Sequence, residues 1–145
     1  MRDDVRDGIA AGLVAAAVSG APSTLWAIAA GDDPLEATLA TGAMVLQNER
    51  SRARLVAAAV PVHVALSLGW GIVLARVLPT RRTGSAGAVA GLAIAALDLR
   101  VVGRRFPRVR ALPLLPQLAD HVAYGATVGL VLQRRRSAVA VRCFR

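Results

Sequence analysis

Four long apolar segments, separated by short charged stretches, dominate the hydrophobic pattern of this chain. They cover approximately residues 8–30, 55–78, 84–103 and 112–133. Each reaches or approaches the ~20 residues that an α-helix needs to cross about 30 Å of hydrocarbon. Charged side chains are almost absent inside these segments and are concentrated between them. The pattern predicts an all-α fold, a polytopic membrane four-helix bundle, with a water-soluble alanine-rich bundle as the alternative.

The first apolar segment is expected to begin near Gly8, with Asp7 as its N-cap. Pro22 lies in mid-segment and is expected to kink this helix or to end its first half. The segment is longer than the apolar core of a signal peptide, so we expect it to be retained. Pro61, immediately before the histidine motif of the second segment, is a further candidate for a kink.

A short additional helix is predicted at residues 34–46, between the first two apolar segments. Asp33, Pro34 and Glu36 combine a cap, a proline at the first position and an acid in the first turn, which is a typical helix start. Three leucines separated by small residues follow. We expect this helix to lie at the membrane surface or tucked against the bundle.

Two stretches of the chain resemble one another. His63 and His121, the two histidines of the sequence, each begin a His-Val-Ala motif, and a glycine follows eight residues later, at Gly71 and Gly129. The spacing Gly-x-x-x-Gly-Leu likewise occurs in both the first and the third apolar segment. We interpret these similarities as the tandem duplication of a two-helix unit. The copies would be related by a pseudo-two-fold axis along the membrane normal.

The resulting organisation is one transmembrane domain over residues 1–145. Repeat A covers about residues 8–78, including the inserted helix, and repeat B about residues 84–133. A C-terminal tail at 134–145 follows. Glycines at four-residue spacing are expected to bring the helix backbones into close contact. They are Gly8, Gly12, Gly71, Gly87, Gly91, Gly125 and Gly129.

A few polar residues are expected to lie at the same depth within the predicted helices. His63 lies thirteen residues before Arg76, and His121 thirteen before Arg134. At 1.5 Å per residue, each histidine is ~20 Å inside the same end of the bundle. Asp98 enters from that end on the neighbouring helix and reaches a similar depth.

A charged aspartate at this depth is costly without a partner, so we expect Asp98 to form a hydrogen bond with His121. The duplication predicts a weaker counterpart between Ser19 and His63. The candidate site therefore comprises His63, His121, Asp98 and Ser19. Rival partners for Asp98 are Asp120 and Arg100.

Three functional interpretations of these polar residues are open. The preferred one is structural: the polar pairs fix the helix register of a non-enzymatic structural or accessory membrane component. The second is a small-solute or proton transporter that uses the buried Asp/His pair, in a dimer because four helices are few. The third is a haem b protein with His63 and His121 as axial ligands. Small residues on the histidine faces and the scarcity of aromatic residues argue against a haem.

Enzymatic and nucleic-acid functions have little support. The sequence contains no Gly-x-Ser-x-Gly, His-Glu-x-x-His, Walker A or Cys-x-x-Cys motif, so we expect no enzyme. Cys143 is the only cysteine, which excludes an intramolecular disulfide and predicts no metal site. The net charge is +9, yet the basic run at residues 104–110 lacks an aromatic platform for RNA. The arginines cluster at segment ends, where they contact lipid headgroups and favour cytoplasmic termini.

The glycines at four-residue spacing and the His-Val-Ala motifs resemble those of the uncharacterised small bacterial inner-membrane families of the DUF1440/YagU kind. The resemblance covers most of residues 8–133 and is carried by Gly8, Gly12, His63, His121 and Gly129, although the duplication and the inserted helix are not part of that pattern. It implies a multi-pass protein of the bacterial plasma (inner) membrane without an assigned reaction, and it adds no catalytic residues. The expected partners are the lipid bilayer and a second copy or another membrane subunit, and not nucleic acid.

Overall fold

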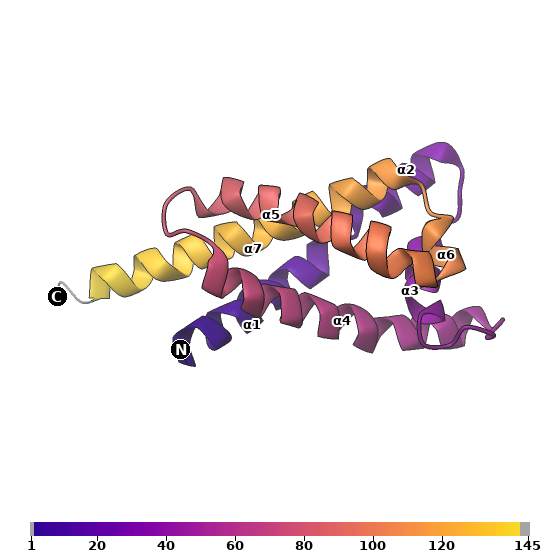
Figure 1. Ribbon diagram of the computed structural model, residues 1–145, viewed down its shortest axis with the longest axis horizontal. Helices are drawn as coiled ribbons and strands as arrows, with labels where there is room; N and C mark the ends of the chain where they lie inside the picture. The colour runs from indigo at the N-terminus through magenta and orange to yellow at the C-terminus, as the bar shows by residue number, and fades with distance from the viewer. Residues whose placement is uncertain (1, 143–145) are drawn as a thin grey trace.

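The computed structural model describes residues 2–142, with the side chains of residues 3–138, and it contains no strand within that range (Figure 1). In chain order the elements are α1 (Arg2–Val18), α2 (Ala21–Ala30), α3 (Glu36–Ala43), α4 (Arg52–Val77), α5 (Thr83–Leu97), the π-helical turn η1 (Asp98–Val102), the 3-10 turn η2 (Gly103–Arg105), α6 (Pro107–Arg110) and α7 (Leu114–Arg142). The all-α class predicted from the sequence is confirmed.

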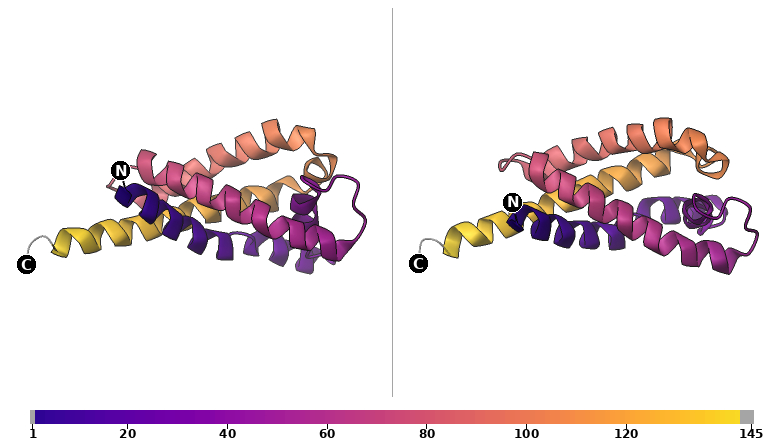
Figure 2. Two further views of the ribbon diagram at one scale, coloured as in Figure 1. Left: turned by 90° about the horizontal axis from the view of Figure 1, so that it is seen from below. Right: turned by 60° about the horizontal axis from the view of Figure 1, so that its bottom comes forward.

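The long helices form two pairs that meet at one end of the molecule and diverge toward the other. α1 packs along α4 and α5 packs along α7, while α7 also contacts α1 and α2. The N-terminus, the α4–α5 connection and the end of α7 lie at one end, and α3 and α6 lie at the other (Figure 1). Figure 2 shows α4 and α5 running apart toward the α3 and α6 end. α4 and α5 are therefore farther apart at that end than where they are connected.

Three helical stretches are long and apolar enough to cross a membrane. They are Asp3–Ala30, Arg52–Val77 and Thr83–Arg105. The length and composition of these helices are consistent with a membrane protein. α7 is long but is not among them, and its first half carries the polar residues Gln117, Asp120 and His121. The fourth span expected from the sequence therefore stays a prediction.

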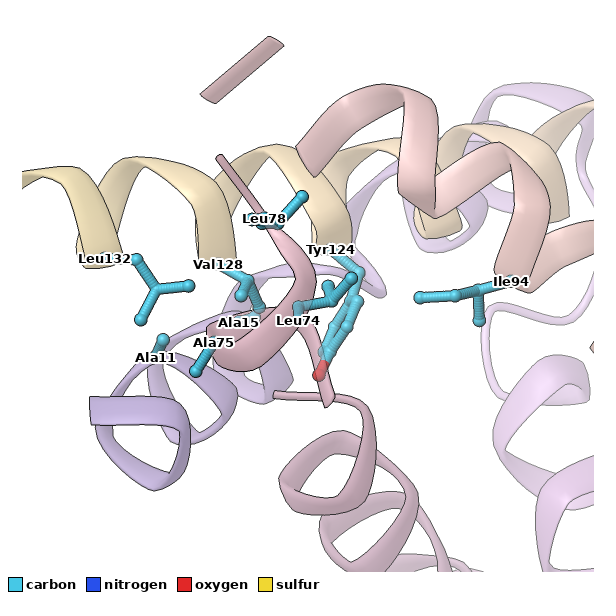
Figure 3. Packing of buried hydrophobic residues seen from close by; sticks show 9 residues of the cluster. All are labelled: Ala11, Ala15, Leu74, Ala75, Leu78, Ile94, Tyr124, Val128 and Leu132. Atoms are coloured by element: carbon cyan, nitrogen blue, oxygen red, sulfur yellow. The ribbon is translucent and has the colours of Figure 1, made fainter. Parts of the chain in front are cut away.

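Many large apolar side chains lie on the surface of this fold. Leu25, Val77 and Val89 are 64%, 65% and 68% exposed. The accessible surface of 9050 Å² exceeds the ~7000 Å² expected for a compact monomer of this mass. Such an apolar exterior needs cover from lipid or protein. The central buried cluster, shown in Figure 3, comprises Ala11, Ala15, Leu74, Ala75, Leu78, Ile94, Tyr124, Val128 and Leu132.

Glycines allow the backbones of α1 and α4 to touch. A Cβ atom at Gly71 would overlap the carbonyl oxygen of Gly8, and a Cβ atom at Gly12 would overlap the carbonyl oxygen of Ser67. With no side chain between them, the two helices approach more closely than larger residues would permit.

The α5–α7 pair uses the same kind of contact. A Cβ atom at Gly87 would overlap the carbonyl oxygen of Gly125, and one at Gly91 would overlap that of His121. Gly129 lies in the same way on the carbonyl of Thr83. All seven glycines selected from the sequence for packing thus lie at contacts within these two helix pairs.

The first helix begins earlier, and the last helix ends later, than the sequence predicted. α1 begins at Arg2 rather than near Gly8, so Asp7 lies inside the helix and is not its N-cap. Nε of Arg135 donates to the Asp7 carboxylate at 2.6 Å. This ion pair joins the start of α1 to α7.

The predicted C-terminal tail is helical to Arg142, because its arginines have partners on the other helices. Arg136 donates to the carbonyl oxygens of Ala75 and Leu78, at 2.7 and 3.2 Å, and so satisfies free carbonyls at the end of α4. Cys143 lies outside the described residues.

The inserted helix is tucked against α4, one of the two positions expected for it. It begins at Glu36, after Asp33 accepts a hydrogen bond from the backbone N–H of Leu35 at 3.0 Å. Leu39 is fully buried, and a Cβ atom at Gly42 would overlap the α4 backbone. Two ion pairs hold the helix at its outer side, Asp33 with Arg52 and Glu36 with Arg108.

We predict that Gly87→Ala destabilises the protein whereas Gly69→Ala does not. The new methyl group would meet the Gly125 carbonyl in the first case, but nothing lies within 4 Å of a Cβ atom at Gly69. Overpacking costs about 1–3 kcal/mol, whereas alanine improves an uncrowded helix by about 1 kcal/mol or less. Thermal unfolding in detergent measures both variants, and equal effects would contradict the packing described here.

We also predict that Arg52→Gln raises the pKa of Asp33. Hydrogen bonding to the Arg52 guanidinium lowers this pKa to about 2, from the ordinary value of about 3.9. Because the folded-state pKa is depressed, the stabilisation from this pair is complete above the ordinary pKa and is lost as the pH falls toward 2. A side-chain NMR titration measures the shift. Arg50→Gln, which changes an exposed neighbour, is the control and should leave the Asp33 titration in place.

Candidate functional site: a polar cavity between the helix pairs

A cavity of about 730 Å³ lies where the two helix pairs diverge. Its wall comes from α1 to α7 together with η1 and η2, so residues distant in sequence meet there. All four candidate site residues predicted from the sequence line it: Ser19, His63, Asp98 and His121. Further polar side chains on the wall are Ser23, Thr24, Thr38, Thr41, Ser67, Gln117, Asp120 and Tyr124.

Asp98 and His121 face each other across the α5–α7 pair. Nε2 of His121 lies 3.6 Å from Oδ2 of Asp98, and the two side chains are only 19% and 27% exposed. The residues lie together as expected from their depths, but this distance is longer than the predicted hydrogen bond. Asp98 is the first residue of the π-turn η1. π-turns within helices occur frequently at functional sites, and the sequence did not predict this one.

The contact of the other ring nitrogen of His121, Nδ1, determines whether Nε2 can donate to Asp98. Nδ1 lies 2.7 Å from the backbone carbonyl oxygen of Gln117. A carbonyl only accepts, so Nδ1 carries a hydrogen. In a neutral ring, Nε2 would then present its lone pair to a carboxylate oxygen of Asp98, and two acceptors repel. The geometry is favourable when one proton resides on the pair, either on His121 or on Asp98.

His63 does not pair with Ser19, which corrects the sequence-based prediction. Its Nε2 atom instead lies 3.0 Å from the backbone carbonyl oxygen of Ala16. The reason is a difference in register between the two helix pairs. Gly12 contacts the backbone carbonyl of Ser67. Gly91, its counterpart in the predicted repeat, contacts the carbonyl of His121, which lies one helical turn before Gly125, the predicted counterpart of Ser67.

The first apolar segment breaks into two helices at the cavity wall, as the position of Pro22 predicted. α1 ends at Val18 and α2 begins at Ala21, with Pro22 in its first turn. The backbone N–H of Ser23 donates to Oδ1 of Asp120 at 2.9 Å. A helix start offers free N–H groups and a partial positive charge, which together stabilise a carboxylate.

The two rival partners of Asp98 do not pair with it, and the second candidate proline does not end its helix. Asp120 caps α2 rather than pairing with Asp98, and Arg100 is exposed on the wall of a smaller pocket. Pro61 lies inside α4, which remains one helix from Arg52 to Val77.

Sequence reasoning missed Tyr124 as a member of the site. Its hydroxyl donates to the backbone carbonyl oxygen of Ser67 at 2.5 Å, and the residue is only 7% exposed. This bond links α7 to α4 beside the cavity. Tyr124 is the only tyrosine in the chain and lies inside the second His-Val-Ala motif. Because the chain has so few aromatic residues, a tyrosine within the histidine motif was the signal that could have indicated its place in the site.

No family model, curated protein or solved structure matches this chain. The interpretation of the cavity therefore depends on its own geometry.

The histidines do not fit a bis-histidine haem. Both ring nitrogens of His121 face oxygen atoms, one on Gln117 and one on Asp98, and Nε2 of His63 faces the carbonyl of Ala16. Binding iron through Nε2 would break the contact to Asp98 and that to Ala16. Within the part of the chain that the structure describes, no group of three or more His, Cys, Asp or Glu side chains is arranged to hold a metal ion.

We predict that Asp120→Ala exposes the start of α2, whereas Ser23→Ala does not. Asp120 accepts from the backbone N–H of residue 23, and a serine-to-alanine change retains that N–H. A hydrogen bond to a charged group contributes about 1.5–3 kcal/mol, so amide hydrogen exchange at residue 23 should accelerate about tenfold or more in Asp120→Ala. Unchanged exchange in that variant would refute the capping role.

Proposed function

We propose that this chain is a four-helix membrane carrier that moves a small solute through its cavity with the help of a proton held by Asp98 and His121. The observation that carries the proposal is the placement of the Asp98–His121 pair on the wall of a cavity of about 730 Å³ between two helix pairs. Titratable side chains inside membrane proteins mark substrate and proton pathways. The cavity supplies the space that a solute requires.

The polar residues of α7 support its assignment as the fourth span. Gln117, Asp120 and His121 all line the cavity, so the polar face of this helix points inward. Ionisable residues in spanning helices face a bundle interior or a water-filled cavity. In this proposal the two termini, together with the arginines beside them, lie on the cytoplasmic side of a bacterial inner membrane.

The two helix pairs resemble the halves of a duplicated carrier. Each pair is joined by glycine contacts, and at the break between α1 and α2 the first turn of α2 donates to the Asp120 carboxylate beside the cavity. Duplicated halves with interrupted helices at the midplane are typical of secondary transporters. We therefore infer that the tandem repeat is real and that solute binds between its copies.

A purely structural role for the pair explains less of the geometry. Interhelical hydrogen bonds in membranes contribute on average about 0.6 kcal/mol, and at 3.6 Å this contact is longer than a hydrogen bond. The glycine contacts already hold α5 against α7. The structural role does not require a cavity, whereas a carrier does.

We predict that purified protein in liposomes moves protons in response to a solute, and that Asp98→Asn abolishes this response. Liposomes that contain a pH-sensitive dye are acid inside and receive, in turn, tetraethylammonium, benzenesulfonate or mannitol. At least one solute should collapse the pH gradient with the wild-type protein, and the rate should fall roughly tenfold or more in the variant. Asp32→Asn changes an exposed acid outside the cavity and should retain the wild-type rate.

Folding of the variants separates the two interpretations. A carrier role leaves the unfolding free energy of Asp98→Asn within about 1 kcal/mol of the wild type. If no solute alters the internal pH and Asp98→Asn instead lowers the melting temperature in detergent, the pair has a structural role and the carrier proposal is wrong.

A further inference from the structure

We infer that the solute is a monovalent organic cation with an apolar body, and that it binds as the proton of the Asp98–His121 pair leaves. This inference rests on the proposed function and names the class of solute. Its basis is the distribution of charged and aromatic residues between the cavity and the rest of the chain.

The charge of the cavity is opposite to that of the protein. The chain has eighteen basic residues against nine acidic ones, yet the cavity wall contains Asp98 and Asp120 and, among the described residues, no arginine. The other titratable side chains that face it are His63 from α4, and His121 and Tyr124 from α7. In an apolar environment such a site attracts a cation and repels an anion.

Aromatic residues are also concentrated at this cavity. The chain has only two Trp, two Phe and one Tyr, and three of these line the wall: Trp70, Phe106 and Tyr124. They come from α4, the segment before α6, and α7, so they surround the space from different sides. Aromatic faces attract organic cations and at the same time bury their apolar parts. Trp26, by contrast, is 49% exposed and lies outside the cavity.

The two carboxylates have different roles in this site. Asp120 already accepts the Ser23 N–H at the positive end of α2, which compensates its charge. Among the described side chains, Asp98 faces only His121 as a charged partner, at 3.6 Å, so the proton of this pair is what balances its charge. When that proton leaves to water, Asp98 remains as a carboxylate beside a neutral histidine, and the cation takes the place of the proton. One positive charge enters for each one that leaves, so the charge of the site is unchanged.

Exposed residues on the cavity wall suit an amphipathic solute. His63 and Leu66 of α4 line the cavity and are exposed, Leu66 by 45%. In the proposed membrane orientation these side chains face lipid. A cation with an apolar body partitions into the bilayer interface and can enter from there.

Binding in detergent to two ions of similar shape and opposite charge tests the inference. Tetraphenylphosphonium and tetraphenylborate are titrated into the full-length protein by calorimetry, in weak buffer with a pH indicator. We expect the cation to bind at least tenfold more tightly than the anion and to release about one proton per molecule bound. Tighter or equal binding of the borate, or cation binding without proton release, would overturn the inference.

Three variants test whether the cation binds in this cavity. Asp98→Asn should remove proton release and weaken cation binding at least tenfold, and Phe106→Leu should weaken it severalfold. Trp26→Leu, an aromatic change outside the cavity, should have no effect. Cation binding that survives Asp98→Asn unchanged places it in the detergent or on a lipid-covered surface and contradicts the inference.

The outcomes also separate this inference from the proposed function. If tetraphenylphosphonium fails to bind while benzenesulfonate or mannitol collapses the pH gradient in liposomes, the carrier stands and the solute class is wrong. If the cation binds and releases a proton but no solute moves protons across liposomes, the solute class stands and the carrier is wrong.

Discussion

Direct contact between helix backbones at glycine residues is the constraint on which this structure depends. Gly8, Gly12 and Gly71 join α1 to α4, and Gly87 and Gly125 are central to the contact of α5 with α7. Within a bilayer, burial of apolar side chains gives helices no advantage over contact with lipid, so close packing and polar contacts have to supply the association energy. Small residues of this chain therefore lie at the contacts between helices, and many of its large apolar residues lie on the exterior.

The cavity is a consequence of where these contacts end. Each helix pair is joined internally, but the pairs meet each other mainly through α7 and α1. At the α3 and α6 end no comparable contact joins α4 to α5, and the space between them is lined by the polar residues of both pairs. The same glycine contacts thus hold the bundle together and leave its polar residues around an open volume.

Position within an apolar segment predicted much of this site from the sequence. The depth of Asp98 and His121 relative to the arginines at the helix ends was sufficient to place them side by side. Pro22 correctly marked the break between α1 and α2, and the four-residue spacing of small residues identified the contacting glycines. These features depend on local pattern and helix geometry alone.

Features that depend on tertiary contacts were not predictable. The register of α1 on α4 differs by one turn from that of α5 on α7, and this difference moved the partner of His63 from Ser19 to Ala16. The sequence of residues 98–102 gives no signal for a π-turn. α7 continues past its expected end because Arg135 and Arg136 have partners on α1 and α4. The sequence of α7 alone cannot indicate these partners, since they belong to other helices.

Reactivity of two residues near the break between α1 and α2 tests the central claim, that a water-accessible polar cavity lies inside a membrane-embedded bundle. Val18 is 47% exposed and does not line the cavity, whereas Thr24 is exposed and lines it. In a chain with Cys143 replaced by serine, Val18→Cys and Thr24→Cys are treated with a membrane-impermeant cationic methanethiosulfonate in liposomes. The account predicts that Thr24→Cys is modified and that Val18→Cys is protected by lipid. Modification of Val18→Cys at an equal or higher rate would contradict it.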